Sequence, residues 1–79
     1  MTNEEKIKAE VFDQLIDHLR ARTELQNIEL MDLAGFCRNC LAKWYMEAAT
    51  RNAQQIEYED ARQLIYGMSY DDWKKKYQK

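Results

Sequence analysis

The chain has 79 residues, 12 of them basic and 14 acidic, with a formal net charge of -2, two glycines and no proline. This length limits it to one small domain, and such domains often depend on a metal, a disulfide or a second subunit for stability. The near balance of charge gives no strong field to attract nucleic acid, and no apolar run approaches the roughly 20 residues that span a membrane.

The first expected helix covers Asn3–Ala21. Thr2 and Glu5 have the spacing of a capping box, in which each residue satisfies a free N–H group of the other at a helix start. His18, the single histidine, lies within the apolar arc of this helix and could face a neighbouring helix. At 100° per residue, that arc is made by Ile7, Val11, Phe12, Leu15, Ile16 and Leu19.

A short apolar helix is expected over Glu24–Ala34. Thr23 and Gln26 repeat the capping-box spacing, and Gly35 suits the left-handed residue that often ends a helix. The apolar side chains of this segment cannot all point into the core of one monomer: Leu25, Ile28, Leu30, Met31 and Leu33. The surplus therefore indicates a contact with a second molecule.

Three further helices are expected in the second half of the chain. One covers Cys37–Asn52 and a second covers Glu57–Tyr66, which Gly67 terminates. Ser69 has the position of an N-cap for a last short helix that runs through Trp73 to Tyr77. The sequence thus predicts an all-α fold, a compact bundle of about five short helices in a single domain over the whole chain, residues 1–79.

No catalytic motif is evident. Two isolated glycines build no phosphate loop, and neither a Ser-His-Asp set nor a Glu-x-x-His pair is present. The acidic residues at 57–60 and 71–72 fall in expected first turns, where negative charge complements the helix dipole, and the lysines at 74–76 fall in a last turn. The sequence therefore favours a non-enzymatic role, and binding of nucleic acid is not expected.

Both cysteines belong to one C-x-x-C pair, Cys37 and Cys40, within the stretch GFCRNCLAKWY. Residues three apart on a helix face the same way, so the two thiols are expected to project from one side among apolar neighbours. The simplest role is that of free, buried thiols, which behave as small hydrophobic side chains. A metal site and a redox pair are the two alternatives.

The metal site and the redox pair each have one argument in favour and one against. Zinc requires four ligands, whereas Cys37, Cys40 and His18 supply three, unless two subunits each contribute a cysteine pair. No cofactor is therefore expected, with zinc or another transition metal as the alternative at the cysteine pair. For redox chemistry, the positive end of a helix beginning at Cys37, with Arg38 and Lys43 nearby, favours a thiolate. However, the strand–helix–strand pattern that surrounds a thioredoxin-like motif is missing.

Two stretches of the sequence carry a family resemblance. They are HLRARTELQNIELMDLAGFCRNCLAKWYMEAA, His18–Ala49, and YEDARQLIYGMSYDDWKKKY, Tyr58–Tyr77. Both resemble the short bacterial proteins grouped as domain of unknown function family 1244. The phrases QNIELM, GFCRNCL and YGMSYDDW carry most of the similarity. The resemblance implies a small, cytoplasmic, helical bacterial protein, and it brings no activity, substrate, cofactor or functional residue.

The sequence predicts an interaction module that forms a homodimer. A different protein is a second possible partner. Adaptable methionines and a neighbouring aromatic cluster would lie at or beneath the contact: Met31, Met46, Met68, Phe36, Leu41, Trp44 and Tyr45. The alternative is a metal-binding or thiol-redox protein that uses Cys37 and Cys40. The polar first ten residues do not resemble a secretory signal, so a cytoplasmic location is expected.

Overall fold

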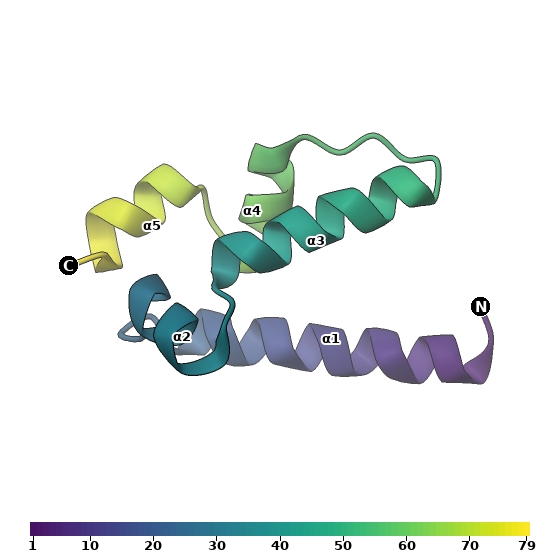
Figure 1. The fold of residues 1–79 in the computed structure, drawn as a ribbon, viewed down its shortest axis with the longest axis horizontal. Coiled ribbons are helices and arrows are strands. Elements are labelled where there is room, and N and C mark those ends of the chain that lie inside the picture. The colour runs from purple at the N-terminus through teal and green to yellow at the C-terminus, as the bar shows by residue number, and fades with distance from the viewer.

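The structure is a computed structural model that describes residues 1–79. It contains five α-helices and no strand, which confirms the all-α prediction (Figure 1). The helices are α1 (Asn3–Ala21), α2 (Asn27–Ala34), α3 (Arg38–Arg51), α4 (Tyr58–Tyr66) and α5 (Tyr70–Tyr77). The longest helix, α1, runs along one side of the molecule, and α4 packs against α3, α1 and α5.

The start of α1 follows the sequence pattern closely. Thr2 Oγ1 accepts a hydrogen bond from Glu5 N at 3.1 Å, and Glu5 Oε1 accepts one from Thr2 N at 3.3 Å. This capping box and both ends of α1 are as expected from the sequence. The helices α3 and α4 begin one residue later than expected, because Cys37 and Glu57 are their extended N-cap residues.

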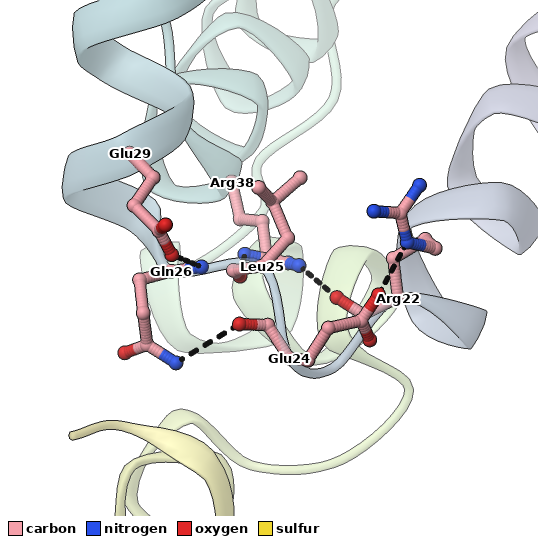
Figure 2. A network of polar contacts seen from close by, with 6 residues as sticks. All are labelled: Arg22, Glu24, Leu25, Gln26, Glu29 and Arg38. Atoms are coloured by element: carbon pink, nitrogen blue, oxygen red, sulfur yellow. Dashed lines mark hydrogen bonds and ion pairs between the residues drawn. The ribbon is translucent and has the colours of Figure 1, made fainter.

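The start of α2 was predicted wrongly. The helix begins at Asn27, and Gln26, rather than Thr23, is its N-cap. Glu29 Oε1 accepts a hydrogen bond from Gln26 N at 2.9 Å, a contact drawn in Figure 2. The physical reason lies in the preceding loop, where the carbonyl of Leu25 accepts a hydrogen bond from Arg38. That carbonyl is therefore drawn away from the helical position that the sequence pattern assumed.

Two glycines and one serine end or begin helices as expected. Gly35 and Gly67 adopt left-handed conformations, with φ of 78° and 75°, at the ends of α2 and α4. Ser69 Oγ accepts a hydrogen bond from Asp72 N at 3.1 Å and so caps α5. At Gly67, the guanidinium of Arg20 donates to the carbonyl of Leu64, which ties α1 to the end of α4.

The core is small, and helices α1 to α4 all contribute to it. Seven buried residues form one cluster: Ile16, Leu19, Leu30, Leu41, Ala42, Ala61 and Ile65. The last helix is attached through aromatic packing, since the ring centroids of Tyr66 and Trp73 lie 5.1 Å apart. No helix combines the length and the apolar character that crossing a membrane requires.

The first half of α1 contributes nothing fully buried to this core. All of residues 1–11 are exposed, and the first buried residue of the helix is Ile16. An isolated helix shorter than about 12–15 residues, such as this exposed half, is only marginally stable in water, and most helical stability in proteins comes from packing of an apolar face. The exposed half of α1 is therefore the part of the fold with the least support from the rest of the chain.

Candidate functional site

The cysteine pair lies at the start of α3. Cys37 is the N-cap, with an extended backbone (φ -134°, ψ -179°), and its side chain makes no capping hydrogen bond. Cys40 lies in the first turn of the helix, and the two Sγ atoms are 3.7 Å apart. Both thiols are half-buried and free. The expectation that they project from the same side is confirmed.

Arg38, which follows Cys37, is the one charged residue that is fully buried, with 1% of its surface exposed. Its Nη1 donates to Leu25 O at 2.7 Å and to Asn27 Oδ1 at 3.0 Å, and its Nη2 donates to Arg22 O at 2.8 Å. Figure 2 shows the guanidinium reaching into the loop before α2. Its Cζ also lies 4.8 Å from the centre of the Trp73 ring. Neutral oxygens and an aromatic face thus hold this cation, which makes no ion pair.

A second set of hydrogen bonds joins the same place to α4. Asn27 Nδ2 donates to Tyr66 Oη at 3.0 Å, and Tyr66 Oη donates to Asn39 Oδ1 at 2.8 Å. Burial raises the pKa of Tyr66 well above its ordinary value of 10.0, so this side chain is a neutral phenol. We refer to Arg38, Asn27, Tyr66 and Trp73 as the Arg38 junction. It connects the loop before α2 with α3, α4 and α5.

Sequence reasoning missed this junction. The position of Arg38 on α3 gives no sign that it is buried, because an arginine between two cysteines reads as a surface charge or as an electrostatic neighbour of the thiols. No sequence signal marked it, because the segment with capping-box spacing at Thr23 resembles a helix start, whereas the structure has a loop there. A loop that must leave carbonyl oxygens unpaired needs a donor from elsewhere in the fold.

An open groove of about 320 Å³ lies beside Cys37. It extends to the C-terminal tail, which Gln26 holds in place: Nε2 donates to Tyr77 O at 2.9 Å, and Oε1 accepts from Lys79 N at 3.0 Å. Four amide side chains and one lysine contribute to the lining, which is Gln26, Asn27, Ile28, Met31, Cys37, Asn39, Tyr70, Gln78 and Lys79. Cys37 borders this groove, whereas Cys40 is not part of its lining.

His18, the third residue of the expected metal set, is exposed on α1. It borders a shallow hollow that is otherwise lined by Val11, Gln14 and Leu15, all from the same helix. No group of three or more histidine, cysteine or acidic side chains is arranged so that it could hold a metal ion. The structure therefore brings Cys37 and Cys40 together and does not group His18 with them.

The acidic clusters occupy the places expected from the sequence. Glu59 and Asp60 lie in the first turn of α4, and Asp71 and Asp72 lie in the first turn of α5. Glu59 also forms an ion pair with Arg62. These positions are those in which negative charge stabilises a helix start, so the structure gives the carboxylates a local electrostatic role.

A second candidate surface is the exposed apolar side of α1. We define the α1 face as Ile7, Val11 and Leu15, which are 62%, 61% and 37% exposed. Beside it lies a groove of about 450 Å³ between α1 and α3, lined by Lys8, Ala9, Phe12, Leu41, Trp44, Tyr45 and Ala48. Large exposed apolar surfaces on small proteins commonly mark interaction sites.

The helix α2 also carries exposed apolar side chains, as expected. Ile28 and Leu33 are 68% and 86% exposed, whereas Leu30 is buried in the core. The α1 face was not distinguished from the core by the sequence pattern. The breadth of the apolar arc of α1 was the available signal, because one neighbouring surface can cover only part of so wide an arc.

The family comparison matches most of the chain. The family model described as "Protein of unknown function (DUF1244)" matches residues 25–79. This range contains α2 to α5, both cysteines and the whole Arg38 junction, and it begins after the end of α1. A search of curated proteins finds no match to the chain.

Proposed function

We propose that this chain, which belongs to the DUF1244 family of proteins of unknown function, acts as a homodimeric interaction module. The observation that carries this proposal is the exposure of the first half of α1, where all of residues 1–11 are exposed although they include Ile7 and Val11. A helix that leaves apolar side chains in water gains stability when a second surface covers them, by about 1.5–3 kcal/mol for each one fully buried.

The pattern of α1 favours a second copy of the same helix as the partner. In an antiparallel pair with its two-fold axis at Val11, each residue meets the residue equally far on the other side of Val11. Ile7, four positions before, then meets Leu15 of the partner, four positions after, and Val11 meets its own copy. A two-fold contact must be self-complementary in this way, and the α1 face fulfils the condition.

The polar residues that border the α1 face also pair with one another under this symmetry. Glu4 and His18, each seven positions from Val11, come opposite each other, as do Lys8 and Gln14. None of these pairs places like charges together, and one of them joins a carboxylate to a histidine. The absence of like-charge pairs among these residues is consistent with an antiparallel arrangement, because flanking polar residues commonly set the orientation of paired helices.

Sedimentation velocity over a series of concentrations tests the proposal. The wild type is expected to change from monomer to dimer with rising concentration, and Val11→Asp is expected to weaken the dimer at least tenfold, because it places two carboxylates at the two-fold axis. Val11 is exposed in the monomer, so the substitution leaves the folded monomer intact.

Leu33→Asp is the matched control, since Leu33 is also an exposed apolar residue but lies on α2. This variant is expected to dimerise like the wild type. If Leu33→Asp dissociates the dimer and Val11→Asp does not, the contact lies on α2 and the proposed pairing of α1 is wrong. A wild type that stays monomeric at high micromolar concentration would overturn homodimerisation and leave a different protein as the partner for this surface.

A second candidate function is a metal-binding or thiol-redox role in a reducing cytoplasm. It is supported by the distance of 3.7 Å between the Sγ atoms of Cys37 and Cys40, which suits two thiolates that bind one ion or that form a disulfide. The pair supplies two of the four ligands that structural zinc requires, so a zinc site would need further ligands from a second copy.

Elemental analysis of protein purified without a metal-affinity tag tests the metal form. Half an equivalent of zinc per chain, lost in Cys40→Ala, is the expected result for a site shared by two chains. His18→Ala serves as a control, since His18 does not lie with the cysteines. Protein without stoichiometric metal, even after incubation with zinc, would exclude this form of the second candidate.

A further inference from the structure

The cysteine pair is arranged for reversible bond formation. The sulfur atoms of a disulfide lie about 2.05 Å apart, so the observed separation of 3.7 Å closes with a modest movement of the side chains. Cys37 lies outside the regular helix, as its N-cap, and its thiol has no capping hydrogen bond to lose. The thiol of Cys37 can therefore move towards Cys40 while the backbone of α3 stays in place.

Arg38, the residue that follows Cys37, is buried and makes no ion pair. Burial lowers the pKa of Arg38, whereas the negative charge that Tyr66, Cys37 or Glu24 can carry raises it. Tyr66 remains a neutral phenol at physiological pH, because burial raises its pKa. Glu24 is exposed and pairs with Arg22. A buried guanidinium without an ion-pair partner therefore belongs to the residue next to Cys37 in the chain.

The surroundings of the two thiols differ in access. Cys37 borders the groove of about 320 Å³ beside the C-terminal tail, and Cys40 does not. Gln26 and Asn27 already use both amide atoms in internal hydrogen bonds, whereas Asn39 Nδ2 and the amide of Gln78 do not. Together with Lys79, these two amides can hydrogen-bond a peptide-like molecule and attract its carboxylates. A small disulfide of peptide character that enters the groove therefore meets Cys37 first.

We propose that Cys37 and Cys40 form a redox-active dithiol that reacts with peptide-like low-molecular-weight disulfides, with Cys37 as the attacking thiol and Cys40 as the resolving thiol. This assignment rests on the second candidate function and selects its redox form. It is independent of the pairing through α1.

The reaction with glutathione disulfide has two steps. The thiolate of Cys37 attacks one sulfur of glutathione disulfide, forms a mixed disulfide and releases one glutathione, which takes up the proton lost by Cys37. The thiolate of Cys40 then attacks Sγ of Cys37, which closes the intramolecular disulfide and releases the second glutathione with the proton of Cys40. Two electrons pass from the protein dithiol to glutathione disulfide, which is reduced to two thiols.

Intact mass measurement of the reduced, tag-free protein during incubation with glutathione disulfide tests this assignment. The wild type is expected to lose two hydrogen atoms without a lasting adduct, and dithiothreitol is expected to reverse the change. Cys40→Ser is expected to retain one glutathionyl group on Cys37, because the resolving thiol is missing. Cys37→Ser is expected to react at least tenfold more slowly than Cys40→Ser. Equal rates in the two variants would overturn the roles assigned to the cysteines.

Lys79→Gln separates recognition by the groove from the reactivity of the thiols. It is expected to slow the reaction with glutathione disulfide about threefold, as for one exposed ion pair, and to leave the reaction with the neutral disulfide of 2-mercaptoethanol unchanged. Equal rates of wild type and Lys79→Gln with glutathione disulfide would overturn the groove as the entry site.

Parallel incubation with zinc distinguishes failure of this inference from failure of the second candidate function. Protein that binds zinc through the pair, yet forms no disulfide with glutathione disulfide, overturns the redox assignment and leaves the metal form standing. Protein that neither binds zinc nor forms a disulfide overturns both. Circular dichroism of each serine variant is expected to match the wild type, since both cysteines are only half-buried.

Discussion

The first half of α1 and the Arg38 junction stand at opposite extremes of the same small fold. In residues 3–11 every side chain is exposed, and apolar groups meet water. At the Arg38 junction even a guanidinium is buried, and both of its terminal nitrogens donate to oxygen atoms of the loop before α2. The first half of α1 leaves its apolar side chains without packing partners, whereas the guanidinium of Arg38 is packed and hydrogen-bonded within the chain.

This difference is the basis of the proposal that a second molecule covers part of α1. The junction joins α3, α4, α5 and the loop before α2 within one chain, so this part of the fold supplies its own partners. The α1 face has no such partners. The family model also begins at residue 25, after the end of α1. Substitutions in the two regions should therefore act on different quantities, on the stability of the monomer in one case and on association in the other.

The largest effect is expected at the junction itself. Arg38→Met keeps much of the side-chain volume but removes three hydrogen bonds to Leu25, Asn27 and Arg22, and it leaves buried oxygens without a donor. The expected loss is about 3–5 kcal/mol in the free energy of unfolding. Urea denaturation followed by circular dichroism measures it.

Arg51→Met is the matched control, because Arg51 is an exposed residue in the last turn of α3. Its expected cost is within about 0.5 kcal/mol. Equal stability of the two variants would show that the buried contacts of Arg38 do not hold the junction together, and the contrast between the two regions would disappear.

The next largest effect concerns the link between α1 and α4. Gly67 has a left-handed backbone, and a Cβ placed there would lie 3.1 Å from the side chain of Arg20. Gly67→Ala is expected to lower the free energy of unfolding by about 2 kcal/mol, through backbone strain and displacement of Arg20. Gly35 has a similar φ, but a Cβ added there has no neighbour within 4 Å, so Gly35→Ala is expected to lower the free energy of unfolding by about 1 kcal/mol. Thermal unfolding compares the two variants. Equal losses of stability would show that the contact with Arg20 does not contribute to the effect of Gly67→Ala.

A smaller effect depends on pH. Burial raises the pKa of Tyr66 above its ordinary value of 10.0, so the folded protein holds the phenol proton more tightly than the unfolded chain does. The corresponding stability is present below pH 10 and is lost as the pH rises towards the pKa of the folded state. Tyr66→Phe is expected to cost about 1 kcal/mol at neutral pH, because it removes the hydrogen bonds with Asn27 and Asn39.

Thermal unfolding of the wild type and Tyr66→Phe from neutral pH to above pH 10 measures the contribution of Tyr66 to this loss. The wild type is expected to lose more stability than Tyr66→Phe over the alkaline part of the range. Parallel curves for the two proteins would show that Tyr66 titrates equally in the folded and unfolded states.

The smallest effect concerns the charges beside the α1 face. Glu4→Lys is expected to weaken the dimer about threefold, because a lysine then faces His18 of the partner instead of a carboxylate. Adding His18→Glu to the same chain is expected to restore the affinity. Sedimentation equilibrium measures both variants. A double variant that is weaker than Glu4→Lys alone would be inconsistent with the antiparallel register centred on Val11.

The sequence was informative wherever structure depends on neighbours along the chain. The capping box of Thr2, the left-handed glycines and the N-cap at Ser69 are local features, and the structure contains each of them. The proximity of the two thiols also follows from a spacing of three residues at a helix start. The all-α fold could be predicted for the same reason, since the chain lacks the turn residues that hairpins require.

The parts that could not be predicted depend on contacts between distant segments. The start of α2 was misplaced because Arg38, thirteen positions after Leu25, takes the carbonyl that a longer helix would have used. The burial of Arg38 itself depends on the ring of Trp73, near the end of the chain. Likewise, the pattern of α1 could not tell which part of its apolar arc the rest of the chain would cover.

Amide hydrogen exchange at several protein concentrations tests the contrast between the two regions most directly. Protection of residues 3–11 is expected to rise with concentration as the α1 face becomes covered, whereas protection of α3 and α4 around the Arg38 junction is expected to stay constant. Protection of residues 3–11 that does not change from low to high micromolar concentration would contradict the proposal that a second copy of the chain covers this helix.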